Sequence, residues 1–187
     1  MLKRKVLVTG ISNLSEARYC SGMFVDYLCF ELSEDHKDYI PKEKVLEIKN
    51  WLSGPKIGGR IENWPTHLTA EDWQDLGLDF LIITDAQKYA QAREIVSEMF
   101  YEVNTTDNFD APDKYDHILI HRDSLPETFI GHPSIFAGHN IAGGDLPSLL
   151  MNENFKGIRL KGSHETSTGE STYGDLMDVL EGLEEDY

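Results

Sequence analysis

The stretch from residue 5 to residue 32 constrains the fold more than any other part of the chain. It has the pattern of a strand, a glycine turn, a helix and a second strand. The apolar run at residues 6–8 ends at Thr9-Gly10, which is typical of a strand buried on both faces. A helix is predicted over residues 14–23 and a second buried strand over residues 25–30. This spacing predicts a right-handed βαβ unit with parallel strands.

Helix signals recur along the chain. Asn13 and Thr69 each precede a helical pattern and can accept hydrogen bonds from its first free amides. Pro41 opens another helix, with a buried face that begins at Val45. We expect a further helix from Ala86 to Met99, with Ala92, Ile95 and Met99 on one face, and a last helix over residues 171–183.

The remaining apolar runs complete a set of eight predicted strands. Little room is left for full helices around residues 104–116. Strands that alternate with helices predict a single domain over residues 1–187, a compact (β/α)8 TIM-barrel-like fold with one or two shortened helices. An open doubly wound sheet is the alternative, because periodicity does not prove closure. These later strands are predicted at residues 55–61, 78–85, 100–103, 117–121, 134–137 and 157–160.

Composition narrows the classes of partner. The chain has 187 residues, with 17 Lys and Arg against 33 Asp and Glu, and its net charge of −16 argues against nucleic acid as a partner. The two cysteines, Cys20 and Cys29, lack the spacing of a metal site and predict buried, reduced thiols in a cytoplasmic protein. No apolar stretch is long enough for a membrane span, so we expect no membrane partner.

The opening unit also carries a family resemblance. The sequence from Thr9 to Ala17, TGISNLSEA, resembles the start of the phosphoribosylanthranilate isomerases, where the first strand ends Lys-Ile-Cys-Gly-Ile-Thr-Asn. Similar residues follow at 38–41, at Gly138-His139 and at 158–165. The resemblance implies a barrel enzyme of tryptophan biosynthesis that converts N-(5-phosphoribosyl)anthranilate into an aminoketose by an Amadori rearrangement. It implies a phosphorylated small-molecule substrate, and we expect no cofactor and no metal.

The resemblance assigns catalysis to two positions that are both substituted here. In the family, a cysteine on the first strand is the general base and an aspartate on the sixth strand is the general acid. Thr9 and His121 stand at these positions. A threonine hydroxyl is a poor base at neutral pH, whereas histidine titrates near pH 6.5 and can donate a proton. The isomerase activity is therefore expected to be weak, absent or carried by other residues.

Substrate contacts are implied in the same way. The family arginine that meets the anthranilate carboxylate aligns with Asp38, so the adjacent Lys37 would have to replace it. Asp85 lies at the carboxyl end of the predicted fourth strand, at the rim where barrel active sites lie. Phosphate is expected at the loops after the last two strands, where glycine lets the backbone approach closely, although such glycines also serve as simple turns. The phosphate candidates are Gly138, His139, Lys161, Gly162 and Ser163.

Two other functions stay open. A non-catalytic barrel could bind a phosphorylated ligand or a protein partner; it would have a filled or acidic pocket between the first and sixth strands. In that case an apolar patch beside the shortened helices would favour a homodimer. Alternatively, a different isomerase or lyase could act on a phosphorylated sugar through His121 with Asp85 or Glu31. The glycine-rich lid that the family carries after its sixth strand has no counterpart at residues 122–129.

Overall fold

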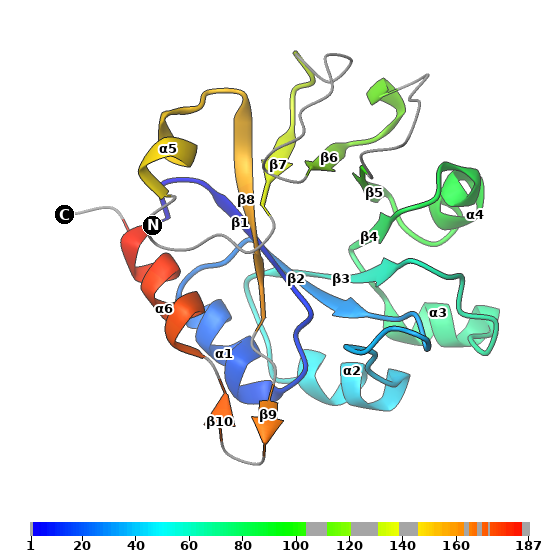
Figure 1. Ribbon diagram of the computed structural model, residues 1–187. Coiled ribbons are helices and arrows are strands. Elements are labelled where there is room, and N and C mark those ends of the chain that lie inside the picture. Colours follow the sequence, from blue (N-terminus) through cyan, green and yellow to red (C-terminus); the bar gives the residue numbers. More distant parts are fainter. Residues whose placement is uncertain are drawn as a thin grey trace.

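Eight parallel strands close into one barrel in a computed structural model that describes residues 2–103, 112–120, 131–138, 146–162, 165–167, 170–171 and 173–184. Each strand pairs with the next one in the chain, and the eighth returns to pair with the first along Lys5–Thr9 (Figure 1). This closure confirms the TIM-barrel prediction and excludes the open sheet. The strands are β1 (Lys5–Thr9), β2 (Tyr27–Glu31), β3 (Lys56–Ile61), β4 (Phe80–Ile83), β5 (Glu98–Glu102), β6 (His117–Ile120), β7 (Ile135–Ala137) and β8 (Phe155–Lys161).

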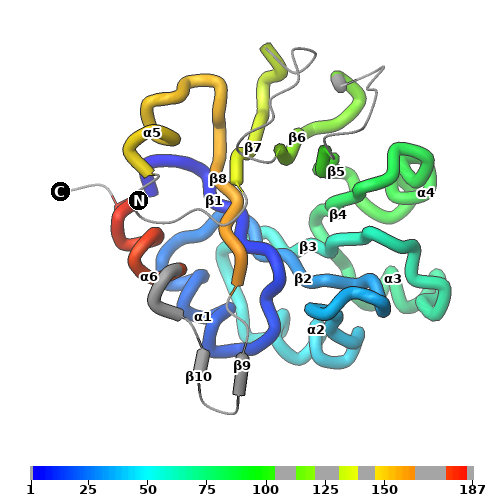
Figure 2. Tube along the Cα trace, viewed as in Figure 1, coloured from blue at the N-terminus to red at the C-terminus, as the bar shows by residue number. Residues whose placement is uncertain are grey.

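Helices lie on the outside of this barrel, and the last helix closes the ring against the first (Figures 1 and 2). Leu2 forms an antiparallel bridge with Glu184, and the Lys3 amide donates to the Leu183 carbonyl at 2.9 Å, so the two ends of the described chain are tied together. The helices are α1 (Leu14–Gly22), α2 (Lys42–Lys49), α3 (Ala70–Leu76), α4 (Tyr89–Arg93), α5 (Leu146–Met151) and α6 (Tyr173–Gly182), with 3-10 turns η1 (Ala86–Lys88) and η2 (Pro112–Lys114) and a hairpin of β9 (Glu165–Ser167) and β10 (Glu170–Ser171).

Both predicted helix caps are confirmed. The Asn13 side chain accepts a hydrogen bond from the Glu16 amide at 2.9 Å and starts α1. Thr69 and Asp72 form a reciprocal capping box at the start of α3. Each cap satisfies amides that the helix itself leaves free, which is why polar residues with short side chains mark these two starts.

The lumen of the barrel holds an aromatic and aliphatic layer. Its buried side chains alternate along the strands with those that face the helices. Phe80 and Phe136 fill space that glycine leaves open: a Cβ on Gly58 would lie 2.5 Å from the Phe80 ring, and one on Gly157 would lie 2.2 Å from the Phe136 ring. The layer consists of Leu7, Tyr27, Cys29, Phe80, Ile82, Phe100, Leu119 and Phe136.

The helix predicted from Ala86 to Met99 is wrong in its second half. The helical segment ends at Arg93, and Met99 lies in β5, where it pairs with Leu81 of β4. The chain turns between them, with the Val96 amide donating to the Ala92 carbonyl. Apolar residues at helical spacing cannot be distinguished from a turn followed by a buried strand, and pairing on both sides of β5 decides the matter.

The shortened helices fall where the sequence leaves little room. The structure shows a five-residue α4 between β4 and β5, and in the described residues between β5 and β6 it shows η2 alone. The large exposed apolar side chains of the described chain are Phe24, Trp51 and Met151, which precede β2, β3 and β8. The apolar patch expected beside the shortened helices concerns segments that are largely outside the described residues, so it stays a prediction. No helix in the described ranges is long and apolar enough to cross a membrane.

Candidate active site at the carboxyl end of the barrel

Charged side chains from four strands of the barrel meet at the carboxyl end of the lumen. Arg60 of β3 donates from Nη1 to Glu31 Oε2 at 2.7 Å and from Nε to Glu102 Oε2 at 2.6 Å. Arg159 of β8 donates from Nη1 to the other oxygen of Glu102, also at 2.6 Å. These residues occupy inward positions of β2, β3, β5 and β8, so they cap the aromatic layer. We call Glu31, Arg60, Glu102 and Arg159 the mouth network.

In the mouth network, burial and the neighbouring charges shift the pKa values of Glu102 and Arg60 in opposite directions. Burial alone would raise the pKa of Glu102, but the charges of Arg159 and Arg60 and their hydrogen bonds lower it to about 2. Burial alone would lower the pKa of Arg60, but Glu102 and Glu31 raise it above its ordinary value. Glu102 and Arg60 are therefore charged at neutral pH, and Glu102 is too well stabilised as a carboxylate to serve as a general base.

Thr9 is held by the same network. Its Oγ1 accepts a hydrogen bond from Arg159 Nε at 3.0 Å and lies 3.4 Å from the Leu160 carbonyl oxygen, to which it donates. Neither partner can remove the hydroxyl proton, because one is a cation and the other a backbone carbonyl. The side chain is 2% exposed. Its position supports a role in fixing Arg159 rather than in proton transfer.

A second ion pair lies above the mouth network, at the end of β1. Lys161 Nζ of β8 is 3.0 Å from Asp38 Oδ2. A Cβ built on Gly10, which has a φ of +74°, would lie 3.7 Å from the same carboxylate oxygen. His36 Nδ1 lies 3.9 Å from Asp38 Oδ2. A carboxylate, an ammonium group and an imidazole thus gather where β1 and β8 end. We call Asp38 and Lys161 the rim pair, and His36 is its histidine.

Lys37 and Asp38 differ in their environment. Lys37 is exposed, whereas Asp38 is 6% exposed and paired with Lys161. The cation beside Asp38 therefore comes from across the β1–β8 junction and not from the next residue. Asp85 has a local contact: its Oδ1 accepts from the Gln87 amide at 2.9 Å and caps η1. The binding roles of Lys37, Asp38 and Asp85 stay predictions.

Of the five residues expected to bind phosphate, some lie within the described residues and some do not. Gly138 has a φ of +144°, which favours glycine, and its amide donates to the Ile120 carbonyl. The Gly162 amide donates to the Thr9 carbonyl at 2.7 Å, and a Cβ there would lie 2.9 Å from the Gly10 carbonyl oxygen and from Glu16 Oε1. Both amides are thus engaged by the backbone. His121, His139 and Ser163 lie outside the described residues.

Sequence reasoning missed the mouth network. The available signal was a charged residue in the alternation that faces the lumen in each of three strands, at Arg60, Glu102 and Arg159. A charge at an inward position needs a partner of opposite sign when it is buried. Alternation within a strand could have identified the inward positions, but the pairing across the lumen depends on the register of the closed barrel. In the part of the chain that the structure describes, no three His, Cys, Asp or Glu side chains gather to hold a metal ion.

Solved structures of phosphoribosylanthranilate isomerases share this fold. One, in complex with reduced 1-(o-carboxyphenylamino)-1-deoxyribulose 5-phosphate, has a TM-score of 0.77 at 14% identity, covering 96% of this chain and 98% of its own. The enzyme from Thermus thermophilus gives 0.76 at 15% identity over the same shares, and monomers of the dimeric enzyme from Thermotoga maritima give 0.76 at 14%, again over the same shares. No protein-family model matches the chain, and no curated relative matches it in sequence.

Proposed function

We propose that the barrel is an aldose–ketose isomerase that acts on N-(5-phosphoribosyl)anthranilate, with its active site at the carboxyl end. The observation that carries this proposal is the agreement of the closed barrel, over 96% of the chain, with an isomerase structure that holds a phosphorylated product analogue. In barrels of this kind, substrates meet the loops after the strands. The rim pair and its histidine stand at that position and supply both signs of charge.

Binding of an anionic substrate would depend on cationic side chains that are not already paired within the mouth network. Arg60 and Arg159 are engaged with Glu31 and Glu102, so they hold the floor of the site. Lys161 is 34% exposed and pairs with a single described carboxylate, Asp38. A substrate phosphate or carboxylate could therefore approach Lys161 from solvent. The phosphate group would also need amides beyond Gly138 and Gly162, and His139 and Ser163 follow them directly.

Proton transfer would be divided between two groups. The rearrangement requires an acid that protonates the ring oxygen and a base that removes the proton from C2 of the sugar. We assign the acid to His121, which directly follows β6, and the base to Asp38, because its carboxylate lies over the end of β1 beside Lys161. Thr9, at the position of the family base, would contribute by holding Arg159.

One observation favours a second candidate function. The charges of the mouth network are mutually satisfied across the lumen, as expected for a barrel that binds a phosphorylated ligand or a protein partner without catalysis. Such a protein would keep the Lys161 contact but would not move protons. A homodimer would be compatible with both functions, since the isomerase from Thermotoga maritima is described as dimeric.

The test is the fluorescence decay of freshly generated phosphoribosylanthranilate, with protein purified from a host that lacks its own isomerase. Enzyme-dependent decay is expected for the wild type, with losses of about 100-fold or more in His121→Ala and in Asp38→Asn. Lys44→Ala is the matched control, because Lys44 is partly exposed on α2 and pairs with its helical neighbour Glu47. No decay in the wild type, or in a Thr9→Cys/His121→Asp double variant, would contradict the isomerase and favour the binding protein.

A further inference from the structure

The opposite, amino-terminal opening of the barrel holds a second cluster of titratable and nucleophilic side chains. Glu98 begins β5, His117 begins β6 and Ser134 immediately precedes β7. His117 Nδ1 lies 2.6 Å from Ser134 Oγ, and His117 Nε2 lies 2.7 Å from Glu98 Oε1. A hydroxyl, an imidazole and a carboxylate are thus joined in series by two short hydrogen bonds. We call these three residues the serine relay.

The direction of both hydrogen bonds follows from the acidity of the groups. Burial would raise the pKa of Glu98, but hydrogen bonds from Lys56, His117 and Tyr27 lower it, so the carboxylate is an acceptor at neutral pH. The Nε2 atom of His117 must then carry a proton, and the Nδ1 lone pair accepts from the hydroxyl of Ser134. Burial lowers the pKa of His117 more than Glu98 raises it, so the imidazole is neutral and free to accept a second proton.

The ring of His117 has little freedom to turn. It packs against Phe100 with ring centroids 4.2 Å apart and contacts the edge of Phe136 at 5.6 Å. Tyr27 donates to Glu98 Oε1 at 3.0 Å, and Lys56 pairs with the other oxygen of the same carboxylate. The carboxylate that orients the imidazole is therefore itself fixed from two strands, which is the arrangement that an activated nucleophile requires.

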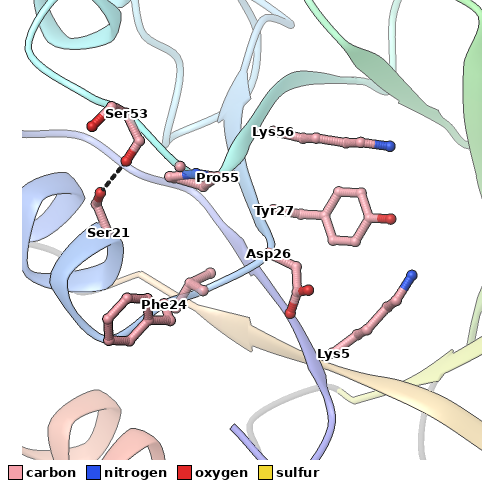
Figure 3. Close-up of a pocket in the computed structure, with 10 residues that line it drawn as sticks. Lys5, Ser21, Phe24, Asp26, Tyr27, Ser53, Pro55 and Lys56 are labelled. Atoms are coloured by element: carbon pink, nitrogen blue, oxygen red, sulfur yellow. Dashed lines mark hydrogen bonds between the residues drawn. The ribbon is translucent and has the colours of Figure 1, made fainter. Parts of the chain in front are cut away.

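An open pocket of about 430 Å³ lies at the same end of the barrel. Figure 3 shows Tyr27 and Lys56 extending side by side, with the ammonium group of Lys5 directed toward them. Tyr27 connects this pocket to the serine relay, since its ring lies 5.8 Å from that of His117 and its hydroxyl reaches Glu98. The charge of Lys5 is also among the causes that lower the pKa of His117. Phe24, 75% exposed, adds an apolar wall.

We propose that Ser134 is an activated serine that is acylated by small carboxylic esters, with His117 as general base and Glu98 as the residue that orients it. In the first step, Ser134 Oγ bonds to the carbonyl carbon, its proton moves to His117 Nδ1, and the alcohol leaves with that proton. In the second step, water attacks the acyl-serine, His117 takes the proton of the water and returns it to Ser134 Oγ, and the acid is released. Both steps balance without any further reactant. This activity is independent of the isomerase site.

A serine-selective fluorophosphonate probe tests the proposal on the intact chain. We expect one probe molecule per folded chain, mapped to Ser134 by peptide mass spectrometry, and release of alcohol from p-nitrophenyl acetate that the probe abolishes. His117→Gln should slow labelling by about 100-fold or more, and Glu98→Gln should slow it as well. Labelling of the wild type should be high where His117 is neutral and should fall only as pH drops below 6.5, because the pKa of His117 is lowered in the folded chain.

Ser21→Ala is the matched control, because Ser21 lines the pocket and its hydroxyl donates to the Ser53 carbonyl, away from the serine relay. It should label at the wild-type rate, and circular dichroism should show each variant folded. The proposal would be overturned if the wild-type chain were not labelled at Ser134. It would also be overturned if folded His117→Gln and Glu98→Gln were labelled as fast as the wild type. In that case the three side chains would only satisfy one another at the barrel floor.

Discussion

The two ends of the barrel use charge differently. At the carboxyl end, Arg60 and Arg159 share the carboxylate of Glu102 and lower its pKa to about 2. At the amino end, hydrogen bonds run in one direction from Ser134 through His117 to Glu98. The first arrangement neutralises buried charge, whereas the second links a hydroxyl to a carboxylate through an imidazole. A ligand at the carboxyl end must therefore bind above the mouth network, at the rim pair of Asp38 and Lys161.

The largest effect is expected from breaking the mouth network. Replacing Glu102 by Gln removes the buried carboxylate that Arg159 and Arg60 share, although Arg60 keeps Glu31, and breaking a buried ion pair by removing one partner costs about 3–5 kcal/mol. Urea denaturation should show this loss in the free energy of unfolding. Glu62→Gln is the control: Glu62 also pairs with Arg60, at 3.2 Å, but it is half exposed and should matter by less than about 1 kcal/mol. Equal effects of the two substitutions would contradict the buried network.

A smaller effect is expected from the layer that separates the two ends. Gly157→Ala would place a Cβ 2.2 Å from the Phe136 ring and should destabilise the barrel by about 1–3 kcal/mol through overpacking. Gly22→Ala, at the end of α1, meets nothing within 4 Å and should be neutral or slightly stabilising. The unfolding temperatures of the two variants should be compared with that of the wild type. If Gly157→Ala were as stable as Gly22→Ala, the lumen would be less tightly filled than the structure indicates.

The smallest effect is expected in the pH dependence of stability, where His117 at the amino end and Glu102 at the carboxyl end act in different pH ranges. The pKa of His117 is lowered in the folded chain, so the unfolded chain binds more protons and stability falls as pH drops below 6.5. The pKa of Glu102 falls from 4.5 to about 2, so its stabilisation is present above pH 4.5 and is lost between about pH 4.5 and 2. The free energy of unfolding, measured against pH, should decline in two stages. His117→Gln should remove the first and leave the second.

Much of the fold was predictable because its signals are local. The run at residues 6–8, the caps Asn13 and Thr69 and the strand around Phe80–Ile83 all depend on neighbouring residues, and the structure confirms each. The helix expected up to Met99 was wrong because a buried strand and a buried helical face contain the same residue types. The hairpin β9–β10 was missed, since its polar sequence carries no apolar alternation.

The candidate site was less predictable because it depends on contacts across the barrel. That Thr9 would bond to Arg159, 150 residues away, follows only from the pairing of β1 with β8. The position of Lys161 beside Asp38 follows from the same pairing. The resemblance directed attention to Thr9 and Asp38, but it could not show that cations from β8 accompany both. For the same reason the serine relay, which joins β5, β6 and β7, was not predicted.

The most direct test of where the substrate binds is a nuclear magnetic resonance titration with reduced 1-(o-carboxyphenylamino)-1-deoxyribulose 5-phosphate, the compound bound in a structure with the same fold. We expect saturable shifts of the amides of Gly10, Asp38 and Gly162 at the carboxyl end, and a loss of affinity in Lys161→Met. The amides of Lys5 and Lys56 at the other opening should not move. No shifts at all, or shifts confined to the amino end, would contradict an isomerase site at the carboxyl end.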